Sequence, residues 1–432
     1  MSWLKVTAAL ALGAMSVLGT AGTASAAAGG PAAPGVTAAA AIVLDGDSGQ
    51  VLWERNAHQR RAMASTTKIM TSLLAVESGR LDETVTISKR AASIGEATIF
   101  LKEGEKLSLR DLTYGVLLSS GNDASTAVAE FLGGGSEAKF IELMNKRAAE
   151  LGLKNTHFTN PHGLPSADHY STAYDLAVLL RVASAVPAWN QIAETKIKKI
   201  PLLGKADGRT LRSHNKLLWN YPHATGGKTG FTNAAGRCFI GSARKNGRFV
   251  IQSTLAASDL WGDSQKLLAW GLDNFESVVV AKKGEIVGTV PIKSGSNRMV
   301  EVVAPRDVTV VLPRGTAERA NLQQVWQLPD QLNAPVDLNQ PVGQLIVKHN
   351  EKVLATVPLV AAQAVPAAAS TWEHISSWFF PGMLAASVLS LFRLQGGRRK
   401  ARKVKRRVKR MPPRPVPPPM KRGGTGRLWK AS

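Results

Sequence analysis

The chain contains one cysteine and few histidines, which excludes several classes of site. With Cys238 alone, no disulfide can form within the chain and no cysteine-rich metal site can be built. The eight histidines include no His-Glu-x-x-His pattern, which argues against a zinc peptidase. We therefore expect neither a metal ion nor a cofactor, and we predict that Cys238 is a buried strand residue.

Acidic residues are scarce, and the C-terminal tail has none. The 432 residues include 54 Lys and Arg against 31 Asp and Glu, a formal net charge of +23. Such a charge is typical of proteins that bind nucleic acids. However, the sixteen basic residues from Arg393 to Ser432 hold most of the excess, and the rest of the chain is only mildly basic. We therefore expect no nucleic-acid partner.

Long apolar runs are also rare, and the first is typical of an export signal. Val6–Leu18 carries no charge, follows Lys5 and precedes Ala24-Ser25-Ala26, a small-x-small cleavage pattern. A transmembrane anchor is the alternative, but the run is short for a span and small residues follow it. We predict a cleaved signal peptide over 1–26 and an exported protein.

Changes in composition divide the remaining chain. Its length and its 44 % hydrophobic content suit two folded domains with additional segments. Short β-prone runs separated by Gly, Pro, Asn and Lys turns begin near Glu276 and predict a small all-β domain. The predicted order is a linker at 27–37, a main domain at 38–275, a β domain at 276–363, a linker at 364–370, an anchor helix at 371–392 and a basic, Pro-rich, disordered tail at 393–432.

The main domain has the periodicity of a helical cluster beside an antiparallel sheet. Hairpins are expected over 40–54 and over 238–255, the second turning at Asn246-Gly247. Apolar residues at helical spacing predict helices near 69–76, 109–118, 125–131, 138–151 and 267–275. The predicted fold class is therefore α/β in the sense of an α+β domain, followed by the all-β domain.

Ser65-Thr66-Thr67-Lys68 is a Ser-x-x-Lys element that opens the first of these helices. One helical turn places residues i and i+3 on the same face, so Lys68 Nζ can reach Ser65 Oγ. The serine N–H also lies near the positive end of the helix dipole. Taken alone the motif is weak, because other Ser-x-x-Lys elements begin at Ser136, Ser213 and Ser242, and such a serine is usually a cap or a surface residue.

The order of two further motifs distinguishes Ser65 from these other serines. Ser120-Gly121-Asn122 follows about 55 residues later, and Lys228-Thr229-Gly230 about 105 residues beyond that. Ser-x-x-Lys, Ser-x-Asn and Lys-Thr-Gly occur in this order in penicillin-binding proteins and serine β-lactamases. The other three Ser-x-x-Lys elements come after Ser120 and are therefore out of order.

On these motifs the chain resembles the low-molecular-mass penicillin-binding proteins of the D-alanyl-D-alanine carboxypeptidase type, from about Ala38 to Val360. The resembling segments are Ala64–Thr71, Leu117–Ala124, Asn160–Leu164, Asn215–Trp219 and Gly227–Thr232. The segment after Glu276 is similar to the family's C-terminal β domain. The resemblance implies a penicillin-binding/β-lactamase-like transpeptidase fold, peptidoglycan stem peptides ending in D-Ala-D-Ala as substrate, and β-lactams as covalent inhibitors.

The resemblance also implies roles for individual residues. Ser65 is expected to be the acyl-ester nucleophile and Lys68 the general base, with its pKa lowered by burial and by the like charge of Lys228. Ser120 is expected to relay a proton to the leaving D-Ala, and Asn122 to position the substrate.

Substrate recognition is implied on the strand of the third motif. Lys228 and Thr229 would hold the terminal carboxylate, and the backbone N–H groups of Ser65 and Phe231 would form the oxyanion hole. Gly230 fits a strand that the substrate backbone must approach closely.

One departure from the family concerns the carboxylate. Some members carry an arginine for it on the loop before the closing helix, whereas residues 257–264 of this chain contain no basic residue. Carboxylate recognition would then rest on Lys228 and Thr229, with Arg237 as a further candidate. His162 and His214 are predicted to be structural.

We predict a serine D-Ala-D-Ala carboxypeptidase that removes the terminal D-alanine from stem pentapeptides during cell-wall remodelling. A DD-endopeptidase that cleaves cross-links is the alternative, and the appended β domain favours the carboxypeptidase. A β-lactamase is disfavoured because no Glu-x-x-Leu-Asn segment is present. A non-catalytic cell-wall-binding protein is disfavoured by the intact motifs.

The last apolar run predicts a membrane anchor. Ser370-Thr371-Trp372-Glu373 is typical of a capping box, and a helix over 371–392 would be roughly 33 Å long, close to the bilayer core. The basic residues from Arg398 onward then favour a cytoplasmic tail. The alternative is an amphipathic helix lying on the membrane, with the tail bound to anionic lipids. Either way we predict a periplasmic protein held by membrane lipids at the outer face of the cytoplasmic membrane.

Overall fold

The computed structural model describes residues 31–293, 299–315, 321–349 and 351–367. The predicted signal peptide, anchor helix and basic tail lie outside these residues. Within them, no single helix has both the length and the apolar character needed to cross a membrane. One sharply bent pair, α6 (Ala173–Ser184) with α7 (Pro187–Ala193), passes that test by length and composition only.

A five-stranded antiparallel sheet is the centre of the main domain. Its strand order is β2-β1-β9-β8-β7, so the first and last strands of the domain's sequence share one sheet. The bounds are β1 (Ala40–Asp45), β2 (Val51–Arg55), β7 (Ala224–Thr232), β8 (Gly236–Lys245) and β9 (Arg248–Leu255). Both predicted hairpins are confirmed. Asn246 and Gly247 have φ of 50° and 77°, as a tight two-residue hairpin turn requires.

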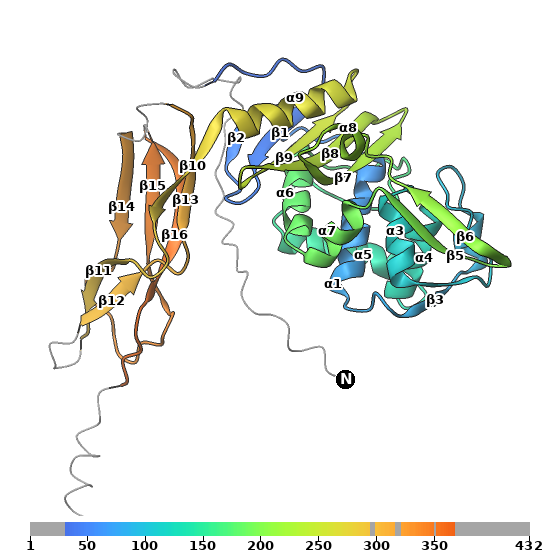
Figure 1. The fold of residues 1–432 in the computed structure, drawn as a ribbon. Coiled ribbons are helices and arrows are strands. Elements are labelled where there is room, and N and C mark those ends of the chain that lie inside the picture. Colours follow the sequence, from blue (N-terminus) through green and yellow to red (C-terminus); the bar gives the residue numbers. More distant parts are fainter. Residues whose placement is uncertain (1–30, 294–298, 316–320, 350, 368–432) are drawn as a thin grey trace, which may run out of the picture. The chain divides into compact units, whose positions relative to one another are not determined.

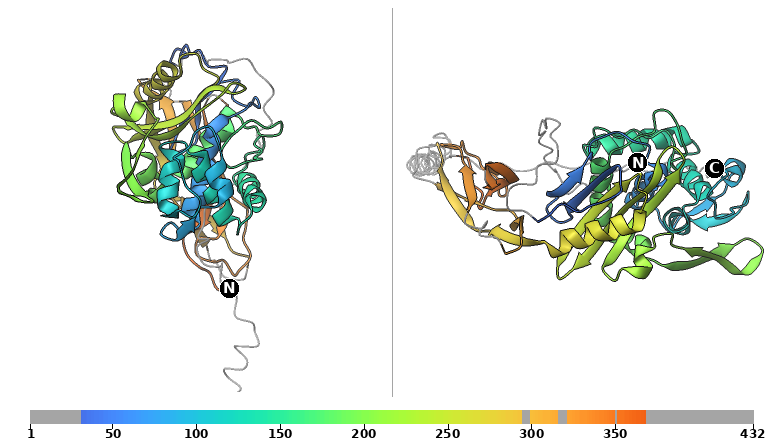
Figure 2. Two further views of the ribbon diagram at one scale, coloured as in Figure 1. Left: turned by 90° about the vertical axis from the view of Figure 1, so that its right-hand side faces the viewer. Right: turned by 90° about the horizontal axis from the view of Figure 1, so that it is seen from above.

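Helices cover both faces of this sheet (Figures 1 and 2). Helix α9 (Leu260–Asp273) packs on one face, where it shares an apolar core with β1, β8 and β9. The opposite face carries the main core, formed with the remaining helices. These include α1 (Lys68–Glu77), α3 (Leu109–Leu117), α4 (Asn122–Leu132), α5 (Glu137–Glu150) and α6. Because both faces are covered, every residue of β9 is buried.

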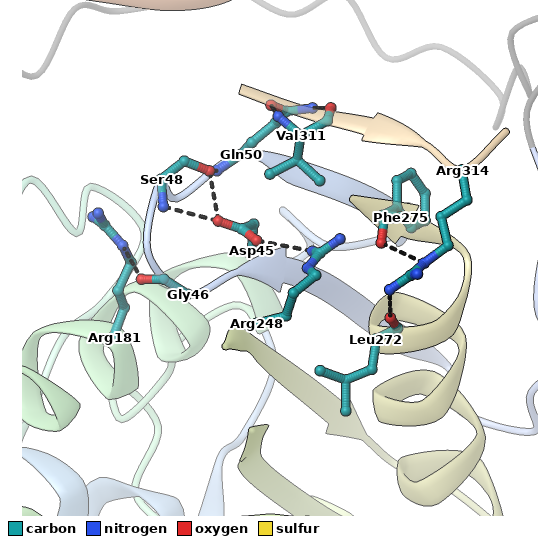
Figure 3. Close-up of polar contacts among 10 residues, drawn as sticks. All are labelled: Asp45, Gly46, Ser48, Gln50, Arg181, Arg248, Leu272, Phe275, Val311 and Arg314. Atoms are coloured by element: carbon teal, nitrogen blue, oxygen red, sulfur yellow. Dashed lines mark hydrogen bonds and ion pairs between the residues drawn. The ribbon is translucent and has the colours of Figure 1, made fainter. Parts of the chain in front are cut away.

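Polar contacts fix the turn between β1 and β2 (Figure 3). The Asp45 carboxylate accepts hydrogen bonds from the backbone N–H and the hydroxyl of Ser48, and it pairs with Arg248 of β9 at 2.9 Å. Both partners of this ion pair are buried, so removing either would leave an uncompensated charge. Arg181 of α6 donates to the Gly46 carbonyl. The turn is therefore bound to both the sheet and the helical cluster.

Two helix boundaries differ from the prediction. Helix α9 begins at Leu260 and not at 267, because the Asp259 side chain caps it by accepting the Gly262 N–H. It ends at Asp273, and Phe275 already belongs to β10 (Phe275–Ala281). Helix α4 begins at Asn122 and not at 125, so the Ser-x-Asn motif forms its N-terminus.

The chain from Phe275 onward forms an all-β region with its own core. It holds a two-stranded sheet of β10 and β13 (Val308–Pro313) and a five-stranded sheet of order β11-β12-β16-β15-β14. The remaining bounds are β11 (Ile286–Pro291), β12 (Met299–Val303), β14 (Leu322–Gln327), β15 (Pro341–His349) and β16 (Lys352–Ala361). The predicted fold class, an α+β domain followed by a small β domain, is confirmed.

Candidate active site

The Ser65 side chain projects from a tight turn at the start of α1. Ala64–Thr67 form one turn of 3₁₀ helix, and Ala64 has a φ of 50°. The loop at Gly163 packs closely against this turn, since a Cβ built on Gly163 would lie 1.9 Å from the Ala64 carbonyl oxygen. A left-handed alanine is unfavourable and persists only where the surroundings hold it. The turn that carries Ser65 is therefore held by contacts from another segment.

Lys68 is the centre of the polar contacts at this turn. Its side chain is fully buried, and Nζ lies 2.9 Å from Ser65 Oγ, 2.7 Å from Asn122 Oδ1 and 2.7 Å from the His162 carbonyl oxygen. Burial, and secondly the charge of Lys228, lower the pKa of Lys68 well below its usual value of 10.5. The lowered pKa that the sequence predicts for Lys68 is therefore present, and so are its two predicted causes, burial and the charge of Lys228.

Two of the three partners of Lys68 fix the direction of its N–H groups. Asn122 Oδ1 and the His162 carbonyl can only accept hydrogen bonds, so they take the two N–H groups of a neutral amine. Ser65 Oγ accepts the third hydrogen bond from Nζ when Lys68 is charged, and because a hydroxyl can also donate, it can hydrogen-bond to the lone pair of the neutral amine. Asn122 Nδ2 donates to the Gly95 carbonyl at 3.0 Å, which supports the assigned orientation of the amide. In its neutral form, Lys68 is thus arranged to accept a proton from Ser65.

Ser120 and Asn122 stand at the N-terminus of α4. Ser120 is 6 % exposed, has a φ of 60°, and its hydroxyl has no hydrogen-bond partner among the described residues. The backbone N–H of Asn122 donates to the Ala97 carbonyl at 2.6 Å. The structure thus links Asn122 directly to Lys68 and leaves the Ser120 hydroxyl available to another group.

Strand β7 brings the third motif to the nucleophile turn. A Cβ on Gly230 would lie 2.9 Å from the Ser65 backbone nitrogen and 3.0 Å from Ala64 Cβ. The close approach predicted for Gly230 is therefore made by the chain's own Ser65 turn, not only by a substrate backbone. Two residues earlier, Lys228 is buried, its Nζ donates to the Thr229 carbonyl, and burial lowers its pKa to about 7.

The outer end of β7 is open to solvent. Thr229 is partly buried, whereas Phe231 is 64 % exposed. Phe231 pairs with Arg237 on β8, and the Arg237 guanidinium donates to the Ser258 carbonyl at 2.9 Å. Arg237 therefore reaches the loop before α9, the loop that carries no basic residue of its own.

The other Ser-x-x-Lys serines have structural contacts. Ser136 caps α5, Ser213 Oγ accepts the Asn215 N–H, and Ser242 Oγ lies 2.8 Å from Thr225 Oγ. The predicted burial of Cys238 in a strand is confirmed.

Sequence reasoning missed two backbone contributions to the site. One is the His162 carbonyl, which binds Lys68, while burial lowers the pKa of the His162 ring to about 3 and keeps it neutral. The other is the segment 95–101, which holds Asn122 through two carbonyls. Backbone carbonyls have no residue-specific signature, and no pattern in the sequence marked either contact.

Comparisons with known proteins find similarity over most of the chain. A family profile described as D-alanyl-D-alanine carboxypeptidase matches residues 27–259, and one described as penicillin-binding protein 5, C-terminal domain, matches 275–367. D-alanyl-D-alanine carboxypeptidase DacF of Bacillus subtilis is 34 % identical over 76 % of this chain and 85 % of its own length. The corresponding DacA of Escherichia coli is 34 % identical over 78 % and 85 %. The crystal structure of penicillin binding protein 5 from Haemophilus influenzae superposes with a TM-score of 0.69 at 30 % identity, covering 78 % of this chain and all of the other.

Proposed function

Because this chain belongs to the D-alanyl-D-alanine carboxypeptidase family and is a serine D-Ala-D-Ala carboxypeptidase of peptidoglycan, we propose that Ser65 is the nucleophile that attacks the bond between the two terminal D-alanines. The observation that supports this most strongly is the contact set of the buried Lys68. Its Nζ lies 2.9 Å from Ser65 Oγ and donates to two oxygens that can only accept, so a neutral Lys68 can direct its lone pair at the Ser65 hydroxyl. Product analysis on monomeric and cross-linked muropeptides tests which bond is cut.

The proposed reaction has two steps. Ser65 Oγ transfers its proton to Lys68 as the Oγ–C bond forms, and the backbone N–H groups of Ser65 and Phe231 stabilise the oxyanion. Ser120 relays a proton to the nitrogen of the leaving D-alanine while Asn122 positions the substrate. Water then cleaves the ester, which releases the shortened peptide as a carboxylate and restores the Ser65 hydroxyl. β-Lactams would form the same ester and inhibit the enzyme.

We propose that Lys228 and Thr229 bind the terminal carboxylate of the substrate. A buried lysine whose pKa is about 7 is only partly charged at neutral pH. A bound carboxylate favours the ammonium form, because opposite charges attract strongly where water is excluded. Arg237, held against the Ser258 carbonyl, is a further cation at this end of β7.

Lys228→Ala is expected to lower kcat/KM for a D-Ala-D-Ala peptide by roughly 10- to 100-fold, the contribution of one charged hydrogen bond. The C-terminal carboxamide of the same peptide should lose much less. In the wild type, kcat/KM for the acid should also fall above about pH 7, as Lys228 of the free enzyme loses its proton. The carboxamide should lack this alkaline limb.

The comparison of acid and carboxamide separates this role from an effect on Lys68. Removing the charge of Lys228 also raises the pKa of Lys68, and that change affects both substrates alike. Lys245→Ala, which removes a lysine paired with Asp273 on the surface, serves as the control. Equal losses on the acid and the carboxamide would contradict a carboxylate role for Lys228.

We also propose that the protein is exported through its signal peptide and anchored by residues 371–392, with membrane lipids as partners. This segment lies outside the described residues, so the support is its length, Trp372 at its start and the basic residues from Arg398 onward. Protease added outside spheroplasts should leave the tail beyond Arg398 intact if the helix spans the membrane. Cleavage of the tail would instead identify a helix lying on the outer surface.

A further inference from the structure

The loop between α2 (Lys89–Ser93) and β4 (Lys106–Ser108) presents a large aromatic ring to solvent. Phe100 is 80 % exposed, whereas its neighbours Ile99 and Leu101 are buried in the main core. Its φ of 59° lies in the left-handed region, which bulky residues avoid. Both the exposed ring and the strained backbone disfavour the folded state. Their coincidence at one residue therefore indicates a role outside stability.

The backbone around Phe100 is held on both sides. The buried Asp123 carboxylate accepts the N–H of Ile99 at 3.0 and 3.1 Å and the N–H of Leu101 at 3.0 Å. Arg209 Nη2 donates to the carbonyl of Phe100 at 2.9 Å. These contacts fix the residue in its left-handed conformation and keep the ring pointing away from the core.

The same loop is connected to the candidate active site. Asn122, whose Oδ1 contacts Lys68, donates from its backbone to the Ala97 carbonyl and from its side chain to the Gly95 carbonyl. Glu96 stands between Gly95 and Ala97 in the sequence, is exposed and has a φ of 62°. The negative charge of Glu96 raises the pKa of Lys68, against the larger lowering by burial. The loop thus presents an acid and an aromatic ring to solvent, both from left-handed residues.

We propose that Phe100 and Glu96 receive the side chain of the stem-peptide residue that precedes the two D-alanines and select a long side chain ending in an amine. The ring offers an apolar surface to methylene groups, and the carboxylate offers a partner to an ammonium group. An extended chain advances at most about 3.6 Å per residue, so this residue lies within reach of Asn122 when the scissile carbonyl is at Ser65. The inference rests on the proposed attack by Ser65 on the D-Ala-D-Ala bond.

Three peptides of one length test the selection: acetyl-Lys-D-Ala-D-Ala, its Nε-acetyl derivative and acetyl-Ala-D-Ala-D-Ala. In Phe100→Asn, the kcat/KM ratio of the Nε-acetyl-lysyl to the alanyl peptide should fall about tenfold relative to the wild type. In Glu96→Gln, the ratio of the lysyl to the Nε-acetyl-lysyl peptide should fall severalfold. Asparagine is suited to Phe100 because it tolerates the left-handed conformation, and Phe100→Gly serves the same purpose if the first variant does not fold.

Leu338→Asn, which removes another exposed apolar side chain in the β domain, is the matched control and should keep both ratios. Phe100→Asn should melt no lower than the wild type, because it removes strain and exposed apolar surface. An unchanged ratio, or equal losses on all three peptides, would overturn the proposal. Penicillin labelling of each variant reports separately on Ser65, so a labelled variant with unchanged ratios refutes only the selection by this loop.

Discussion

Ser65→Ala is expected to abolish covalent labelling by a fluorescent penicillin and to reduce D-alanine release by several orders of magnitude. The acyl-enzyme needs an ester oxygen, and Ser65 Oγ is the hydroxyl that lies 2.9 Å from Lys68 Nζ. The substitution removes one partly exposed atom and leaves the 3₁₀ turn without a clash. The fold should therefore persist, which a thermal melt and circular dichroism would show beside the labelling gel.

The other Ser-x-x-Lys elements of the chain supply the matched control. Ser136→Ala removes a helix cap and should cost about 1 kcal/mol of stability, yet the protein should label fully. Mass spectrometry of the labelled protein locates the adduct. A penicilloyl group on Ser136, Ser213 or Ser242 in the Ser65→Ala protein would show that the nucleophile is assigned wrongly.

Lys68→Met should slow acylation by about 10²- to 10⁴-fold for every substrate, including the carboxamide that Lys228→Ala spares. Methionine has a similar length but no basic nitrogen, so the proton of Ser65 loses its acceptor. The rate of penicillin acylation and the rate of D-alanine release report the same step with two different leaving groups. A loss below tenfold on both would contradict the role of Lys68 as base.

Lys139→Met, at the lysine of the Ser136 element, is the control for the loss of a lysine and should leave acylation unchanged. The pH dependence of stability gives a second readout for Lys68. Its pKa in the folded protein lies well below the usual value of 10.5, so between these two values the unfolded chain binds more protons. Stability therefore rises with pH across this window, and Lys68→Met should lack that part of the slope.

Much of the local structure follows from short-range chemistry in the sequence. Asn246-Gly247 predicts a hairpin turn because both residues tolerate positive φ, and the turn is present. The helix boundaries were less accurate, because the cap at Asp259 extends α9 by two turns beyond its clear apolar periodicity. In the β domain, β14 (Leu322–Gln327) shows where sequence patterns fail. Strand β14 is mostly exposed and mixes polar with apolar residues, so it lacks the alternation that marks a strand.

By itself, the sequence determined the contact between Ser65 and Lys68, because one helical turn brings residues i and i+3 together. It also identified the family through the order of three motifs. Only the tertiary structure decided which groups contact Lys68 beside Ser65: the His162 carbonyl and the Asn122 amide. These groups come from distant parts of the chain, and it is burial, with the charge of Lys228, that favours the neutral form of the amine. No local pattern encodes such contacts, because backbone carbonyls are the same in every residue and their meeting depends on how the whole domain packs.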